Sequence, residues 1–270
     1  IFIFTPFHEY LESPINKNVI PSWDIESDGL QNLDNLISRI IDMEITTLVI
    51  QFNYGYFNFN ELEKLIEKLS YHKIKIILFM HSSQDPSGIP EKKLRSIRNS
   101  LQTCTRIMVH SIDDLNNLKK LDLVNNVTLF PHGILDFMPD NKIKKSRIKL
   151  LSINPNRLIA SYGFCLPNKG YSELIKAVHI LKNKNFRVKL SIYCAIYSDE
   201  YYFVYEELIN LIDSLDLHGD VKLISDFETD SQSLTNLSEN DLLIFPYQSS
   251  NESSSASVRM GLASLKPVLV

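Results

Sequence analysis

The sequence predicts an α/β protein built from two doubly wound parallel-sheet domains, and two observations support that prediction. Short apolar runs alternate with stretches whose apolar residues recur at helical spacing, as expected for strands joined by helices that cover both faces of a sheet. The alternation lapses between Asp136 and Asn156, and it then resumes with the same pattern. We therefore predict an N-terminal domain over 1–138, a linker over 139–156 and a C-terminal domain over 157–270.

The first domain is predicted to begin in a strand at Ile1–Thr5. Leucines and isoleucines at helical spacing indicate a helix within Asp28–Asp42. The same criteria predict strands at Ile45–Phe52, Ile74–Met80, Thr105–Val109 and Val127–Phe130, and helices at Asn60–Ser70, Pro90–Leu101 and Ser111–Lys120. Ser111 and Asp114 have the spacing of a capping-box variant at the start of the last of these helices.

The predicted linker carries a basic run at Lys142–Lys149. Such a run is most often a solvated face. It could also touch acidic lipid headgroups, which would give the protein a peripheral membrane contact.

The second domain repeats the pattern of the first. Strands are predicted at Leu158–Tyr162, Arg187–Cys194, Val221–Ile224, Asp241–Phe245 and Val268–Val270. Helices are predicted at Tyr171–Leu181, Asp199–Ser214 and Asp230–Leu237, and a last one opens at Glu252–Ser255 and ends before Lys266.

The composition argues against several classes of protein. A formal net charge of −4 argues against a nucleic-acid partner. No apolar run approaches the roughly 18 residues of a membrane span, and Ile1–Phe4 lacks the basic start of a signal peptide. Cys104, Cys165 and Cys194 have no metal-ligand spacing, so we expect buried thiols in a protein of the reducing cytoplasm.

The stretch from Asp241 to Val270 combines a strand, a polar loop and a helix that opens with Glu252 and several serines. A loop at the carboxyl end of a parallel strand lines the ligand crevice of an open α/β sheet. The helix start offers backbone N–H groups, hydroxyls and a positive dipole end to an anion. Glu252 suits the hydroxyls of a sugar better than it suits the anion. The local pattern alone also fits a simple helix cap.

This stretch resembles the donor-site motif of retaining GT-B glycosyltransferases of the family 4 type. The motif has two acidic residues, then a small-residue helix and Pro-Val; Glu252 matches the first acid, and Met260 stands where the second would bind the ribose. The resemblance implies the GT-B fold, two Rossmann-like domains that face a cleft, both incomplete here at the chain ends. It also implies that Ser253, Ser254 and Ser255 bind the donor. Arg259, one residue before Met260, is a further candidate for donor binding and could take the place of the missing acid.

The family's phosphate-binding lysine turn is matched by the segment Gly163–Gly170. The resemblance makes Lys169 the residue that neutralises the donor diphosphate, with Gly163 allowing close backbone approach. The arginine that often follows the first glycine is replaced by Phe164. On the local pattern alone the signal is weak, because Lys-Gly before a helix is common.

His81 follows an apolar strand of the first domain, at the position where the family places a histidine that contacts the donor sugar. A histidine at a strand end is otherwise more often structural. Ser82 and Ser83 are weaker candidates. His110 and His132 also match landmarks of the family, and we interpret both as structural.

Asp226–Asp230 follows a strand of the second domain, and the resemblance places this loop beside the nucleobase, with Phe227 near the base. Asp226, Glu228 and Asp230 also fit an acid-x-acid cation site. The family needs no metal for its diphosphate, however, and we expect no metal and no cofactor.

The resemblance predicts a metal-independent hexosyltransferase of polysaccharide biosynthesis, cytoplasmic or peripheral to the inner face of the membrane. It would transfer a sugar, with retention, from a nucleotide-diphosphate sugar to a saccharide or lipid-linked acceptor. His81 and Glu252 would be catalytic. Two alternatives stay open: another GT-B enzyme, such as a nucleotide-sugar epimerase or a glycogen-synthase-like polymerase, and a non-catalytic binding or scaffold module.

Overall fold

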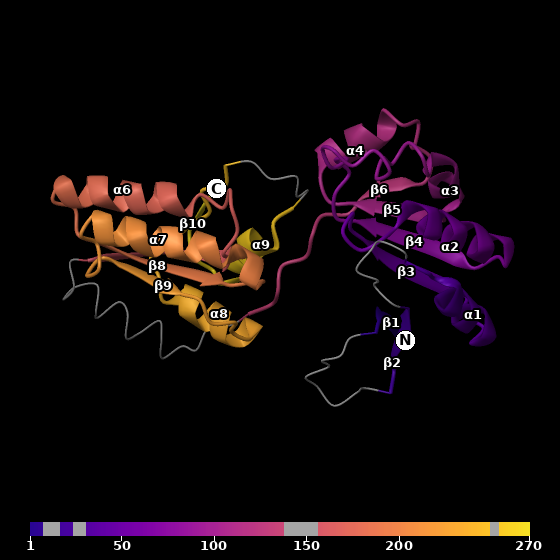
Figure 1. The fold of residues 1–270 in the computed structure, drawn as a ribbon, viewed down its shortest axis with the longest axis horizontal. Helices are drawn as coiled ribbons and strands as arrows, with labels where there is room; N and C mark the ends of the chain where they lie inside the picture. The colour runs from indigo at the N-terminus through magenta and orange to yellow at the C-terminus, as the bar shows by residue number, and fades with distance from the viewer. Residues whose placement is uncertain (8–16, 24–30, 138–155, 249–253) are drawn as a thin grey trace. The chain divides into compact units, whose positions relative to one another are not determined.

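The computed structural model describes residues 1–7, 17–23, 31–137, 156–248 and 254–270 (Figure 1). Contacts within the chain divide it into unit 1, which contains Ile1–Pro131, and unit 2, which contains His132–Ser250 and Ser255–Val270. Both units are α/β with parallel strands, as predicted. The basic run and the predicted linker, apart from Asn156, lie outside the described residues, so the domain boundaries stay predictions.

Unit 1 contains a parallel sheet in the order β3-β4-β5-β6 and a separate parallel pair, β1-β2. Their bounds are β1 Ile3–Pro6, β2 Val19–Trp23, β3 Thr47–Phe52, β4 Lys75–Met80, β5 Arg106–Val109 and β6 Val127–Leu129. The sequence did not predict β2, because Pro21 and Ser22 interrupt its apolar character. Pro21 removes one ladder donor and is tolerated in a two-stranded pair.

The helices of unit 1 lie against one continuous apolar core, and their bounds are α1 Asp34–Asp42, α2 Phe59–Tyr71, α3 Arg98–Thr103 and α4 Ile112–Lys119. The cap predicted for α4 is present, since Ser111 Oγ accepts a hydrogen bond from the Asp114 amide at 3.1 Å. The prediction for α3 was eight residues too long at its start. The amide of Leu94 donates to Asp85 Oδ1 at 3.0 Å, so it does not join a helical ladder.

Unit 2 contains a parallel sheet in the order β11-β10-β7-β8-β9. The bounds are β7 Arg157–Phe164, β8 Val188–Ala195, β9 Val221–Ile224, β10 Leu242–Ile244 and β11 Val268–Leu269. The chain runs outward from β7 through β8 to β9 and then returns to the other side of β7 as β10. The junction of β7 and β10 is therefore the topological switch point, where open α/β sheets leave a crevice outside the carboxyl ends of the strands.

Helices cover both faces of this sheet (Figure 1), and their bounds are α6 Tyr171–Asn183, η1 Asp199–Tyr201, α7 Tyr202–Ser214, α8 Asp230–Ser238 and α9 Ala256–Ala263. Consecutive residues of β7 point to opposite faces. Ile159 packs in the core beneath α6 and α7, and Ala160 packs in the core beneath α8 and α9. This is the doubly wound arrangement that the sequence predicts.

Two further expectations concern the cysteines and membranes. Cys104, Cys165 and Cys194 are all buried and free, as predicted. Within the described residues, no helix combines the length and the apolar character that crossing a bilayer requires.

We predict that Asp220→Asn destabilises unit 2 in a pH-dependent way. Asp220 receives Lys189 Nζ at 2.9 Å and Lys182 Nζ at 3.0 Å, which tie the end of α6 to β8 and the start of β9. The hydrogen bond from Lys189, with that from Lys182, lowers the pKa of Asp220. A carboxylate whose pKa is lowered on folding stabilises the folded state at pH values above the ordinary aspartate pKa. This stabilisation is lost as the pH falls through the pKa that Asp220 has in the folded protein.

Urea unfolding should show a loss of about 1 kcal/mol in the variant near neutral pH and a smaller loss near about pH 3, below the ordinary aspartate pKa. Glu206→Gln, an exposed change on α7, is the matched control and should stay within about 0.5 kcal/mol at both pH values. An equal loss at both pH values would contradict the assignment.

Candidate functional site

The loops that leave β7 and β10 lie against each other at the switch point. Gly170, which begins α6 with a φ of +74°, is so close to the second loop that a Cβ atom on it would lie 1.8 Å from the carbonyl oxygen of Pro246. The amide of Gln248 donates to the carbonyl of Asn168 at 3.0 Å. The lysine turn and the loop before the serine-rich helix are therefore joined, as the sequence analysis requires.

Lys169 is held at this junction. Its side chain is buried, and the ammonium lies 4.4 Å from the centroid of the Tyr247 ring. The Tyr247 hydroxyl is 2.9 Å from Ser255 Oγ, and Ser255 caps α9 by accepting a hydrogen bond from the Val258 amide at 3.4 Å. Lys169, Tyr247 and Ser255 thus link the lysine turn to the start of α9.

Gly163 brings the end of β7 close to the first turn of α9. Its φ is +149°, and a Cβ atom there would lie 2.9 Å from Ser257 Oγ and 3.1 Å from the Tyr171 hydroxyl. Only glycine allows this backbone conformation together with so close an approach. Gly163 was predicted to allow close approach of the backbone, and the structure shows such an approach, to the side chains of Ser257 and Tyr171.

A cavity of about 360 Å³ opens in unit 2 beside these loops. Its walls come from His132, Gly133 and Leu135, the ends of β7 and β8, the loop after β9, the start of α8 and the first turns of α9. The lining includes Gly163, Phe227 and Arg259 among the predicted residues, together with Tyr162, Phe164, Tyr193, Asp226, Glu228, Asp230, Ser257 and Met260. Its volume falls near the lower end of the roughly 300–1,000 Å³ usual for small-molecule sites.

Polar groups in the cavity wall have distinct environments. Burial raises the pKa of Tyr193, with a further contribution from Glu228, so this hydroxyl stays a neutral donor. Glu228 is held by Asn236, whose Nδ2 lies 2.8 and 2.9 Å from its two oxygens. Arg259 supplies a permanently charged guanidinium to the lining.

Three aromatic rings lie at the rim of the cavity. The Phe164 and Phe227 rings are stacked with centroids 6.1 Å apart, and Tyr197 meets Phe164 edge-on at 5.3 Å. Phe227 is 79% exposed, although large apolar side chains are usually buried. The rim therefore presents flat apolar surface to whatever enters the cavity.

The other predicted donor residues lie elsewhere or outside the described part. Ser254 and Ser255 are half-buried at the start of α9, and Ser255 serves as its cap. Glu252 and Ser253 lie outside the described residues. Lys169 does not line the cavity.

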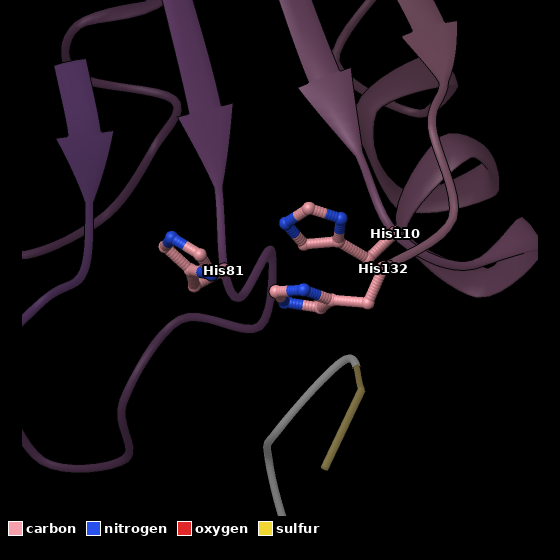
Figure 2. Close-up of side chains that lie close together, drawn as sticks. All are labelled: His81, His110 and His132. Atoms are coloured by element: carbon pink, nitrogen blue, oxygen red, sulfur yellow. The ribbon is translucent and has the colours of Figure 1, made fainter. Parts of the chain in front are cut away.

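His81 follows β4 in unit 1, and His110 follows β5. Their ring centroids are 5.1 Å apart (Figure 2). His81 Nε2 lies 2.7 Å from Gln51 Oε1, and His110 Nδ1 lies 2.8 Å from the carbonyl oxygen of Phe130. Burial lowers the pKa of His81, and the neighbouring His110 lowers it further, so His81 is neutral near pH 7.

The loop after His81 is fixed by a buried hydrogen-bond network. Ser83 Oγ donates to Asp114 Oδ1 at 2.6 Å, and Asn117 Nδ2 donates to Ser83 Oγ at 3.2 Å. Ser83 is therefore a structural residue of this loop.

Sequence reasoning missed several residues of the cavity. Tyr162 and Tyr193 lie inside strands, and only the knowledge that β7 and β8 are adjacent would have placed them at one edge. Ser257 was one of several serines and had no distinguishing signal. Met260 was noted only for replacing an acid, and it lines the cavity.

Comparison with known proteins places this fold. No protein-family model matches the sequence, and no curated protein matches it. Among solved structures, Anabaena Alr3699/HepE in complex with UDP is similar with a TM-score of 0.68 and 16% identity, over 86% of this chain and 62% of that one. An α,α-trehalose-phosphate synthase from Burkholderia xenovorans, in complex with glucose-6-phosphate, is similar with a TM-score of 0.63 and 11% identity, over 85% and 59%.

These similarities define the class of fold. Both units are Rossmann-like, and the chain has the two-domain GT-B fold that the sequence predicts. The chain spans about three fifths of the length of these two structures.

We predict that Gly170→Ala loosens the junction of the two loops. An alanine would have to hold a positive φ and would collide with the Pro246 carbonyl, so the free energy of unfolding should fall by at least about 2 kcal/mol. Gly219→Ala is the matched control, because a Cβ atom there meets nothing within 4 Å. Thermal or urea unfolding of both variants measures the difference, and equal stability would contradict the observed packing.

Proposed function

We propose that this protein is a glycosyltransferase. It would transfer a sugar, with retention, from a nucleotide-diphosphate sugar to a saccharide or lipid-linked acceptor. The GT-B neighbours support a donor of this class, since HepE was crystallised with UDP and with UDP-glucose. The family 4 type, the hexose as transferred group and a role in polysaccharide biosynthesis belong to the same proposal.

One observation carries the proposal: the lysine turn and the loop before α9 meet at the switch point of unit 2, beside a cavity lined by Gly163 and Arg259. A pyrophosphate needs closely approaching backbone, N–H donors and positive charge in one place. The end of β7, the start of α9 and the guanidinium of Arg259 offer these three features.

The departing diphosphate would be stabilised by fixed positive charge. Arg259 acts from the cavity wall, the start of α9 acts through its N–H groups, and Lys169 acts from beside Tyr247. Electrostatic stabilisation of the group on which negative charge develops is the main source of rate enhancement in such a transfer. We propose that the diphosphate needs no metal ion, so its binding should be the same in Mg²⁺ and in EDTA.

The nucleobase would lie on the aromatic rim. The stacked rings of Phe164 and Phe227 offer a flat surface to the base. Phe164 stands where the family often has an arginine. The ribose would meet Met260 where that family has an acid, so this chain would hold the ribose through other polar groups of the lining, such as Tyr193. Glu252 and His81 remain the predicted contacts of the transferred sugar.

A donor screen on the intact protein tests the class of function. Product mass after incubation with nucleotide sugars and candidate acceptors would identify transfer, and a changed sugar on the same nucleotide would identify an epimerase. Binding without any turnover would instead indicate a non-catalytic module, an outcome that Met260 in the ribose position makes worth testing.

We predict that Arg259→Ala weakens binding of both UDP and pyrophosphate. Loss of a charge-assisted hydrogen bond costs about 1.5–3 kcal/mol, or roughly 10- to 100-fold in affinity. Calorimetric titration measures both ligands. Arg157→Ala removes an exposed arginine at the amino end of β7 and should change neither affinity. Equal weakening by the two variants would indicate a general charge effect and contradict the assignment.

We predict that Phe227→Ala weakens binding of the nucleobase and leaves binding of the diphosphate unchanged. Base stacking is worth about 1–3 kcal/mol, so UDP affinity should fall roughly tenfold while pyrophosphate affinity stays unchanged. Phe186→Ala, which changes another exposed phenylalanine, before β8, is the control and should leave both affinities unchanged. If Phe227→Ala leaves UDP binding intact, the rim does not hold the base.

A further inference from the structure

We propose that Glu228 binds the two ribose hydroxyls of the donor nucleotide, and that the protein therefore selects ribonucleoside diphosphates over 2′-deoxyribonucleoside diphosphates. The inference rests on the proposed function, because it takes the cavity of unit 2 to be the nucleotide site. From the sequence, this carboxylate was a candidate only for a cation site.

Glu228 belongs to the part of the cavity wall next to the aromatic rim. It directly follows Phe227, and it lines the same cavity as Gly163 and Arg259. In a nucleoside diphosphate the ribose is the group that joins the base to the phosphates. A nucleotide with its base on the rim and its diphosphate beside Gly163 therefore has its ribose inside the cavity, within a wall that contains Glu228.

Glu228 shares this part of the wall with Tyr193 and Met260. Burial raises the pKa of the Tyr193 hydroxyl, and the nearby charge of Glu228 raises it further. Tyr193 and Met260 pack against the same small core beneath α8 and α9. Within the described lining, α9 contributes no carboxylate, and the thioether of Met260 is only a weak acceptor. Carboxylate acceptors for a hydroxyl group therefore come from the loop after β9 and the start of α8.

The Glu228 carboxylate is held in place by amide side chains of α8. Gln232 Nε2 donates to Asn236 Oδ1 at 3.1 Å, so the NH₂ group of Asn236 is the end that faces Glu228. This Nδ2 lies 2.8 and 2.9 Å from the two carboxylate oxygens. A carboxylate offers about four lone-pair positions, and one amide group cannot fill them all. Glu228 is thus oriented and still able to accept hydrogen bonds from a ligand.

The charge of Glu228 favours a neutral group with hydroxyl donors. Among the described residues, no lysine, arginine or histidine forms an ion pair with it, and Asn236 is its hydrogen-bond partner. Such a carboxylate repels a diphosphate but can accept from both members of a vicinal diol. Asp226 and Asp230 also line the cavity, but both are exposed, so water competes for their oxygens. Glu228 is half-buried and is therefore the acid best suited to the ribose.

This contact has a consequence for the choice of donor. UDP carries a 2′- and a 3′-hydroxyl, whereas dUDP lacks the 2′-hydroxyl and is otherwise identical. A site built to accept a hydroxyl hydrogen rejects a ligand without it, because a desolvated acceptor is then left unpaired. We expect each ribonucleotide to bind at least about tenfold more tightly than its 2′-deoxy form.

The test is a calorimetric titration of the full chain, in EDTA, with UDP, dUDP, GDP, dGDP and pyrophosphate. Glu228→Gln keeps the size of the side chain and removes its charge. It should lower the affinity for the ribonucleotide roughly 10- to 100-fold and reduce the preference over the 2′-deoxy form to about threefold or less. Pyrophosphate affinity should not fall, because the variant loses a repelling charge.

Glu207→Gln removes an exposed carboxylate of α7 and should leave every affinity unchanged. Melting temperatures show whether each variant is folded, and the comparison of nucleotides in the unaltered protein requires no variant. If none of the nucleotides binds, the proposed function fails and this inference fails with it. If a ribonucleotide and its 2′-deoxy form bind equally well, or if Glu228→Gln keeps the full preference, the inference is overturned while the proposed function stands.

Discussion

The contact between the lysine turn and the loop after β10 is the constraint on which the candidate site depends. Gly170 has no side chain because the carbonyl of Pro246 occupies that space, and the amide of Gln248 closes the contact on Asn168. This packing exists because β10 returns to the free side of β7. Two segments about 80 residues apart in sequence therefore share one edge of the sheet, and the cavity opens beside them.

The same rule organises unit 1 in a simpler way. Its strands β3 to β6 follow one another in order across the sheet, so the residues after consecutive strands become neighbours. His81 and His110, which directly follow β4 and β5, lie side by side for this reason. In unit 2 the returning chain creates a crevice at the switch point, whereas in unit 1 the sequential order lines up short loops along a single edge.

Periodicity was sufficient to predict the fold, because buried parallel strands are almost uniformly apolar and their helices have a clear apolar face. Ile74–Met80 and Tyr171–Leu181 are examples that fell close to the observed β4 and α6. The prediction failed where local chemistry overrides the pattern, as in β2 with Pro21, or at α3, where Asp85 captures the amide of Leu94. Gly163, Phe227 and Arg259 were singled out from their motifs and line the cavity, and their roles toward a donor stay predictions. The contact of the Lys169 ammonium with the Tyr247 ring and the pairing of His81 with His110 depend on tertiary packing and register, which no local pattern encodes.

A crystal structure of the protein with UDP bound is the most direct test that the β7–β10 junction is a nucleotide-diphosphate site. The account predicts the diphosphate between the turn at Gly163 and the start of α9, within reach of Arg259, and the base against Phe227. A nucleotide bound at any other place on unit 2, with this cavity empty, would contradict it.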